Sequence, residues 1–168
     1  MGHHEHEKLA QISLRVGVMI FSDTRDASND KSGNILKEML IAAGHPVTGY
    51  RIVREDSQLM RQALEEWLVA AEFDAVITSG GTGLTARDNT VEVARSLFDK
   101  EMEGFGELFR WLSFQQIGAA AMLSRACAGV VADKMLICLP GSSKAVRLAA
   151  ARLIVPQLPH MLWEIRRH

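Results

Sequence analysis

Stretches of apolar residues alternate with polar, glycine-containing stretches along most of the chain. The first apolar run, residues 14–21, has almost no polar alternation, which is typical of a strand buried on both faces of a sheet. Four later runs predict further strands, at residues 47–53, 75–78, 128–131 and 135–139. Helices are predicted at residues 32–43, 57–72, 90–97 and 159–167, and two short helices within residues 104–125. A further, long helix is predicted to begin within residues 140–146 and to end near residue 154.

Residues with strong local preferences mark where these helices begin and end. Gly44 and Pro46 stop the first helix, and we expect Asp56 or Ser57 to cap the second and Thr90 the third. Strands that alternate with helices predict the α/β class, as a three-layer α/β/α sandwich with a mostly parallel central sheet. We expect one domain over residues 13–168, preceded at residues 1–12 by a disordered or tag-like segment.

The composition narrows the class of protein without indicating an activity. The 168 residues suit one domain and carry 19 Lys+Arg against 20 Asp+Glu, a balance that disfavours a nucleic-acid-binding protein. No apolar run approaches the roughly 18 to 20 residues that cross a bilayer, and the first residues lack the pattern of a signal peptide. We therefore expect a cytoplasmic protein that binds neither nucleic acid nor a membrane.

Three polar loops follow predicted strands, and a parallel sheet would bring them to one edge, where ligands bind in this class. The most informative loop consists of Ser79, Gly80, Gly81, Thr82 and Gly83. Three glycines in four residues suit backbone N–H groups that turn toward a phosphate or another anion. A tight turn that needs positive φ is the alternative.

The other two loops add hydroxyl groups and charge. The loop after the last strand consists of Pro140, Gly141, Ser142, Ser143 and Lys144. It opens a helix, whose N-terminus and lysine attract phosphate, although a capped helix with a solvated lysine explains it equally well. The loop after the first strand includes Ser22, Asp30, Ser32 and Gly33. Its polar density fits either a lid or metal-binding role or solvation alone.

Acidic residues beside these loops are candidate magnesium ligands. Asp88 lies five residues beyond the glycine loop, and Glu55 and Asp56 follow the second strand. A carboxylate near a polyphosphate suits Mg²⁺, whereas helix capping is the alternative for Asp88 and Asp56. The sequence contains neither GxxxxGK[ST] nor a GxGxxG after the first strand, and no Cys/His spacing indicates zinc.

Three segments, in this order, resemble the MoaB/MogA family of molybdenum cofactor biosynthesis proteins. They are TSGGTGLTARDNT (78–90), EMEGFGELFR (101–110) and LPGSSKAV (139–146). A fourth, DASNDKSGNIL (26–36), is similar to the segment after the family's first strand. The resemblance spans about residues 14–156 and is closer to the MoaB branch than to MogA.

The resemblance implies a molybdopterin-binding fold, assembled as a homotrimer or homohexamer. In active members the terminal phosphate of molybdopterin attacks the α-phosphorus of Mg-ATP, which gives adenylyl-molybdopterin and pyrophosphate. By position in the motifs, residues 79–83 would hold the pterin or its phosphate, and Asp88 would hold Mg²⁺ or orient the nucleophile. Residues 140–143 would add hydrogen-bond donors, and the nucleotide side would be lined by Asp30, Ser32 and Gly33.

One position departs from the family's pattern. Active MogA-type members have an essential Asp after the second strand, where this chain has Glu55 followed by Asp56. Glutamate keeps the charge but reaches further, so two hypotheses stay open: a molybdopterin adenylyltransferase, or a non-catalytic molybdopterin-binding or carrier protein. An unrelated nucleotide-binding α/β domain is a third. An aromatic-rich segment fits either the core or a subunit interface and contains Phe105, Phe109, Trp111, Leu112 and Phe114.

Overall fold

The computed structural model describes residues 12–167, so the terminal segment expected at residues 1–12 lies, except for Ile12, outside the described residues. Within them the chain forms a six-stranded sheet in the order β2-β1-β3-β6-β5-β4. The strands are β1 (Val16–Phe21), β2 (Val47–Val53), β3 (Ala75–Ser79), β4 (Lys100–Glu101), β5 (Cys127–Val131) and β6 (Lys134–Leu139). The strands β2, β1, β3 and β6 run parallel, whereas β5 and β4 are antiparallel to their neighbours. This confirms the expected mostly parallel sheet.

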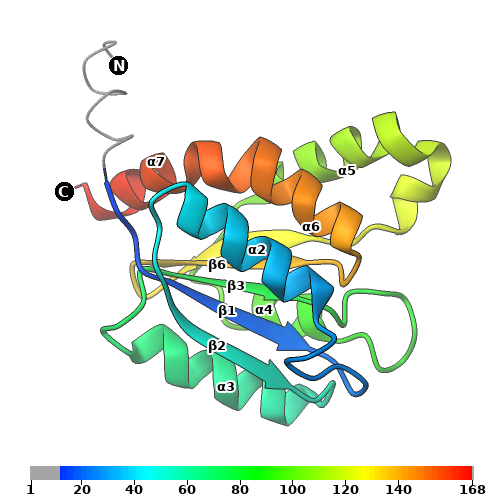
Figure 1. The fold of residues 1–168 in the computed structure, drawn as a ribbon, viewed down its shortest axis with the longest axis horizontal. Coiled ribbons are helices and arrows are strands. Elements are labelled where there is room, and N and C mark those ends of the chain that lie inside the picture. Colours follow the sequence, from blue (N-terminus) through cyan, green and yellow to red (C-terminus); the bar gives the residue numbers. More distant parts are fainter. Residues whose placement is uncertain (1–11, 168) are drawn as a thin grey trace.

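Helices cover both faces of the sheet (Figure 1). One face carries α2 (Lys31–Ala42), α5 (Glu103–Ile117), α6 (Ser143–Ala149) and α7 (Val155–Arg166). The other face carries α3 (Ser57–Val69) and α4 (Thr90–Arg95). The expected α/β/α sandwich is thereby confirmed. No helix of residues 12–167 is long and apolar enough to span a membrane.

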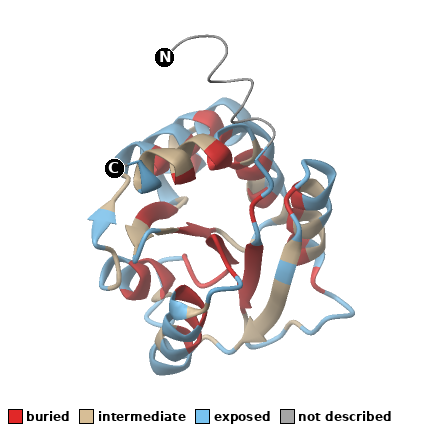
Figure 2. Ribbon diagram, turned by 90° about the vertical axis from the view of Figure 1, so that its left-hand side faces the viewer, coloured by how far each residue is buried: buried red, intermediate tan, exposed pale blue. Residues whose placement is uncertain are grey.

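The continuous apolar runs form strands because the sheet is buried on both faces (Figure 2). All six residues of β1 are buried. Since successive side chains of a strand point to opposite faces, Val18 and Ile20 pack under α2, while Met19 and Phe21 pack against α3. Cys127 and Cys138 are free and buried in the second of these cores.

Several predicted boundaries were wrong for identifiable reasons. The segment 104–125 forms one α-helix, α5, followed by a 3₁₀ helix, η1 (Gly118–Leu123), because Gly118 takes a φ of 62° at their junction. The strand β4 was missed because it has only two polar residues. Thr90 is not a cap: Asn89 precedes α4, and the Thr90 hydroxyl instead donates to the carbonyl of Gly80 at 2.9 Å.

The helix expected to end near residue 154 does not end there. A π-helical turn, η2 (Ala150–Ile154), joins α6 directly to α7. In this turn the N–H of Val155 bonds to the carbonyl of Ala150, five residues earlier. Pro156 has no N–H to donate, and the wider turn lets the helix continue past this position.

Candidate functional site

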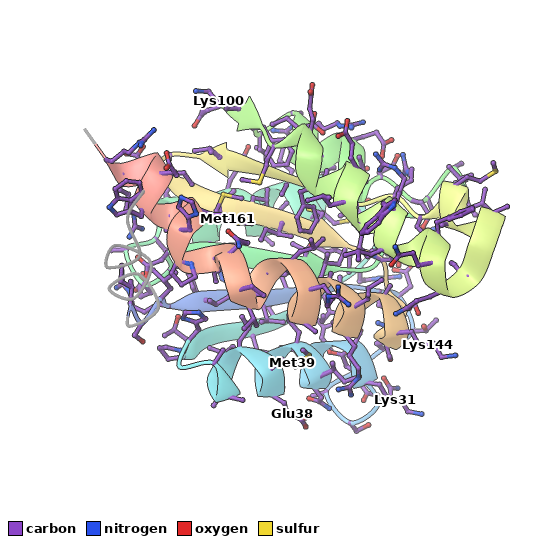
Figure 3. The ribbon with its side chains drawn as sticks, turned by 90° about the horizontal axis from the view of Figure 1, so that it is seen from above. Lys31, Glu38, Met39, Lys100, Lys144 and Met161 are labelled. Atoms are coloured by element: carbon purple, nitrogen blue, oxygen red, sulfur yellow. The ribbon has the colours of Figure 1, made fainter. Side chains whose placement is uncertain are left out.

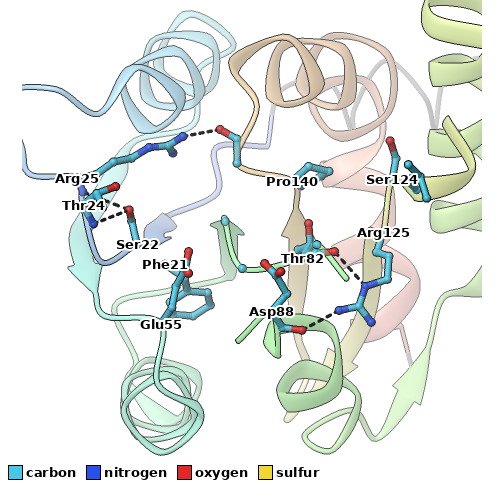
Figure 4. A pocket seen from close by; sticks show the side chains of 15 residues that line it. Phe21, Ser22, Thr24, Arg25, Glu55, Thr82, Asp88, Ser124, Arg125 and Pro140 are labelled. Atoms are coloured by element: carbon cyan, nitrogen blue, oxygen red, sulfur yellow. Dashed lines mark hydrogen bonds between the residues drawn. The ribbon is translucent and has the colours of Figure 1, made fainter. Parts of the chain in front are cut away.

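The parallel strands β1, β2, β3 and β6 all end at one edge of the sheet, and the three polar loops meet there around a cavity of about 440 Å³. Figure 4 shows this cavity from close by. Of the residues singled out from the sequence, those that line it are Ser22, Glu55, Gly80, Gly81, Thr82, Gly83, Asp88, Pro140 and Gly141. Long-range folding therefore brings all three loops to a single cavity.

The glycine loop is folded tightly against the end of the sheet. Gly80 has a φ of 112°, and a Cβ on it would lie 2.1 Å from the carbonyl oxygen of Phe21. Gly81 has a φ of 61°, and a Cβ there would lie 2.4 Å from the Thr90 hydroxyl. Both conditions exclude other residues. The alternative of a tight turn with positive φ therefore describes this backbone correctly, and the same turn forms one wall of the cavity.

Asp88 faces the cavity with its carboxylate held in place by the loop. The N–H and hydroxyl of Thr85 donate to it at 2.9 and 2.5 Å. These hydrogen bonds, together with the nearby N–H of Gly83, lower the pKa of Asp88. The carboxylate does not cap α4, because its partners lie in the preceding loop. It is thus a fixed negative charge at the cavity wall.

Glu55 lines the same cavity as Asp88 (Figure 4). Partial burial raises the pKa of Glu55, and the nearby charges of Asp23 and Asp88 raise it further. A bound cation would relieve this repulsion. Asp56, next in sequence, is not part of the wall: its carboxylate caps α3 by accepting from the N–H groups of Gln58 and Leu59, both at 3.0 Å.

The residues Asp30, Ser32 and Gly33 do not line the cavity. All three are buried at the start of α2. The carboxylate of Asp30 accepts from the Ser32 hydroxyl at 3.0 Å, from the Gly33 N–H at 3.0 Å and from the Tyr50 hydroxyl at 2.7 Å. Burial and this carboxylate together raise the pKa of Tyr50. The segment therefore anchors the first loop from behind.

Most of the loop after β6 also lies outside the wall. Ser79 is buried, and its hydroxyl donates to the Pro140 carbonyl at 3.1 Å, which links β3 to this loop. Ser142 and Ser143 begin α6, where the hydroxyl of Ser142 makes no capping hydrogen bond. Lys144 is exposed and projects at the same end of the helical layer as Lys31 (Figure 3). The lysine is near the site without lining it.

Six lining residues were not singled out from the sequence: Phe21, Thr24, Arg25, Leu123, Ser124 and Arg125. Arg25 joins two loops, since it donates to the Ser32 hydroxyl at 2.6 Å and to the Gly141 carbonyl at 2.8 Å. Its place in the polar loop after the first strand was a usable indication. Arg125 had no such indication, because it follows a helical segment and reaches the glycine loop only through the fold.

The carboxylates of the cavity wall fit a Mg²⁺ ion that is shared with bound phosphates better than a metal ion held by protein side chains alone. Among residues 12–167, no group of three or more His, Cys, Asp or Glu could hold a metal ion. Mg²⁺, however, usually binds one or two carboxylates together with substrate phosphates and water. Glu55 and Asp88, two carboxylates on the wall of one cavity with interacting charges, meet that requirement.

Sequence comparison identifies the family to which this architecture belongs. A family model described as a probable molybdopterin binding domain matches residues 15–160. The chain belongs to this family. Molybdenum cofactor biosynthesis protein B of Bacillus cereus is 47% identical to it over 164 residues, which are 97% of each chain. The Bacillus subtilis protein of the same name is 42% identical over 168 residues, with 99% of each chain covered.

Solved structures of the family superpose closely on the chain. A crystal structure of a molybdenum cofactor biosynthesis protein B has a TM-score of 0.91 and 46% identity, and covers 94% of this chain and 98% of its own. The tungsten cofactor synthesizing protein MoaB from Pyrococcus furiosus has a TM-score of 0.83 at 35% identity, with 92% and 98% covered. A MogA structure has a TM-score of 0.82 at 27% identity, with 90% and 99% covered. The resemblance to MoaB and MogA is thus confirmed.

Proposed function

We propose that this protein binds molybdopterin and adenylylates it with Mg-ATP, releasing pyrophosphate. The observation that carries the proposal is one cavity that combines a glycine loop, the guanidinium of Arg25 and two carboxylates at the ends of parallel strands. Phosphoryl-type transfer depends mainly on positioning and on neutralisation of charge. The cavity offers groups for both purposes.

In the proposed reaction, the terminal phosphate of molybdopterin attacks the α-phosphorus of ATP, and the bond between the α- and β-phosphates breaks. The glycine loop and Arg25 would bind the phosphate groups and orient them for this attack. Glu55 and Asp88 would hold Mg²⁺, which supplies charge neutralisation on the phosphates when it is bound. Asp56 is proposed to act only by capping α3, which fixes the chain next to Glu55.

We also propose that the protein assembles as a homotrimer or homohexamer. An exposed apolar strip on α5 and η1 consists of Leu108, Trp111, Phe114, Ile117, Met122 and Leu123. These side chains are 53% to 76% exposed. By contrast, Phe105, Phe109 and Leu112 of the same segment are buried in the core. A run of large exposed apolar residues is typical of a subunit interface.

A non-catalytic molybdopterin-binding protein is the second candidate, and Glu55 favours it. Its carboxylate stands where active MogA-type relatives are expected to carry Asp, and its pKa is raised by burial and by neighbouring acids. A protonated or displaced carboxylate would hold Mg²⁺ less well. Pterin binding by the glycine loop does not depend on that side chain.

A mixing assay separates the two candidates. Purified protein is incubated with molybdopterin and Mg-ATP, and both adenylyl-molybdopterin and pyrophosphate are followed over time. Parallel reactions omit the protein or use the Asp88→Ala variant. Product above the protein-free control supports the adenylyltransferase, and loss of that product in Asp88→Ala supports the role of Asp88. No product, with molybdopterin still co-eluting with the protein, supports the binding protein, and tight ATP binding without any response to the pterin contradicts both.

A further inference from the structure

Arg125 makes an unusual set of contacts on the wall of the cavity. It lies between η1 and β5, and its Nε donates to the carbonyl of Thr82 at 2.9 Å. Its Nη2 donates to the backbone carbonyl of Asp88 at 2.8 Å. One side chain thus holds both ends of the segment 82–88, as the dashed lines in Figure 4 show.

Further hydrogen bonds to Glu92 occupy most of the remaining capacity of this guanidinium. Nη1 and Nη2 of Arg125 each donate to one oxygen of the Glu92 carboxylate. A guanidinium has five N–H donors in a rigid fork, and these contacts together use four of them. The group is therefore committed to the protein itself and has little capacity left for a substrate.

The contact with Thr82 also fixes the direction of the next N–H along the chain, that of Gly83. In a planar trans peptide the C=O and the following N–H point in opposite directions. Because the Thr82 carbonyl points to Arg125, the Gly83 N–H points away from it, and this N–H lies close enough to the Asp88 carboxylate to lower its pKa. Gly83 also packs tightly here, since a Cβ on it would lie 2.7 Å from Asp88 Oδ2.

We propose that Arg125 is a positioning residue that orients the peptide between Thr82 and Gly83 and thereby aims the Asp88 carboxylate into the cavity. Without the guanidinium this peptide can rotate, since glycine tolerates both orientations. Asp88 then loses the nearby N–H of Gly83 and the restraint on its own carbonyl. The inference deepens the proposed function, because it concerns the same cavity, but the orientation of the loop can be measured without turnover.

The test compares Arg125→Ala and Arg125→Lys with a matched control, Arg95→Ala. Arg95 also forms a two-point pair with a glutamate, Glu101, at 3.0 and 2.9 Å, but no hydrogen bond joins it to the glycine loop. Hydrogen exchange of the segment 82–88 is measured first. We expect exchange there to become at least about tenfold faster in Arg125→Ala, with the rest of the chain unchanged, and to stay at the wild-type rate in Arg95→Ala.

Turnover provides the second measurement. We expect kcat for adenylylation to fall about a hundredfold in Arg125→Ala, because the acid is misplaced, while KM for ATP stays within about threefold of the wild-type value. Added methylguanidinium should restore part of kcat and slow the exchange of the segment 82–88. Lysine keeps the charge but cannot bond both carbonyls through one planar fork, so Arg125→Lys should recover only a small part.

Each outcome decides the proposal. Unchanged exchange of the segment 82–88 in Arg125→Ala overturns it, as does a rise in KM with kcat preserved, which would make Arg125 a substrate ligand. If Arg125→Ala does not fold, Arg125→Lys decides by the same exchange measurement. If the wild-type protein makes no product, the proposed adenylylation fails, while faster exchange in the variant still supports the role of Arg125.

Discussion

Replacing Asp74 with asparagine tests how strongly one buried carboxylate joins distant parts of the chain. Asp74 precedes β3 and accepts hydrogen bonds from the N–H of Arg15 at 2.8 Å and from its Nε at 3.1 Å. Arg166, at the end of α7, donates to the same carboxylate at 2.9 Å. The Asp74 side chain is only 9% exposed, but the side chains of Arg15 and Arg166 are 49% and 42% exposed, so water screens these contacts in part.

The expected loss follows from the pKa of Asp74. Burial alone would raise it, but the hydrogen bonds from Arg15 and Arg166 outweigh burial and lower the pKa from 3.8 to about 2. At about 1.36 kcal/mol per pKa unit, ionisation of Asp74 contributes about 2 kcal/mol to the free energy of unfolding at pH 7. Because the folded-state pKa is depressed, this contribution is complete well above pH 3.8 and is lost as the pH falls toward 2. About half of it remains at pH 3.

The assay is urea unfolding of wild-type protein and Asp74→Asn, at one protein concentration, at pH 7 and at pH 3. We expect the variant to lose about 2 kcal/mol at pH 7 and about half as much at pH 3. Glu66→Gln is the control. It breaks the two hydrogen bonds between Glu66 and Arg51, and the Glu66 side chain is 56% exposed. We therefore expect a smaller loss of free energy of unfolding. Equal stability of Asp74→Asn and wild type at pH 7, or a difference that does not shrink at pH 3, would refute the reasoning.

Three further predictions concern the site and the assembly. Asp88→Ala should abolish adenylylation in the mixing assay while molybdopterin affinity stays within a few fold; unchanged turnover would remove Asp88 from the mechanism. Glu55→Gln should lower kcat at least about tenfold because a Mg²⁺ ligand loses its charge. The control Glu38→Gln, at an exposed acid, should leave kcat unchanged. Equal kcat in Glu55→Gln and wild type would contradict the role of Glu55 as a metal ligand. Light scattering should give the mass of a trimer or hexamer of the 18.6 kDa chain for the wild type, and a smaller mass for the double variant Trp111→Ser/Phe114→Ser. A wild-type monomer at micromolar concentration would rule out the proposed assembly.

The fold was largely predictable because strands buried on both faces need continuous apolar runs. Residues 14–21 and 135–139 could form few other structures in a chain of this composition. The boundaries that failed depend on distant contacts instead. The two-residue strand β4 exists because Lys100 and Glu101 pair with β5, and the hydroxyl of Thr90 is drawn from its expected capping role to the carbonyl of Gly80.

The candidate site was predictable only where its residues carry a local pattern. The glycine loop is recognisable because each glycine loses more backbone entropy on folding than other residues do. Three glycines in four residues therefore indicate a backbone conformation that other residues cannot adopt. Asp30 shows the opposite case: the sequence places it in a polar loop, yet it is buried and bonded to Tyr50 from the neighbouring strand. Burial of that kind is set by packing and leaves no local pattern.

The sequence by itself determined the order of the five longer strands and of the helices around them, the three loops at the strand ends and the acids beside them, because each depends on residues close together in the chain. Only the tertiary structure decided which charged groups meet at the cavity. Arg125 bonds to Thr82, 43 residues earlier, and Arg25 bonds to Gly141, 116 residues later. Every residue has the same backbone carbonyl, so the sequence does not indicate which carbonyl a distant arginine will bond. The path of the folded chain decides it.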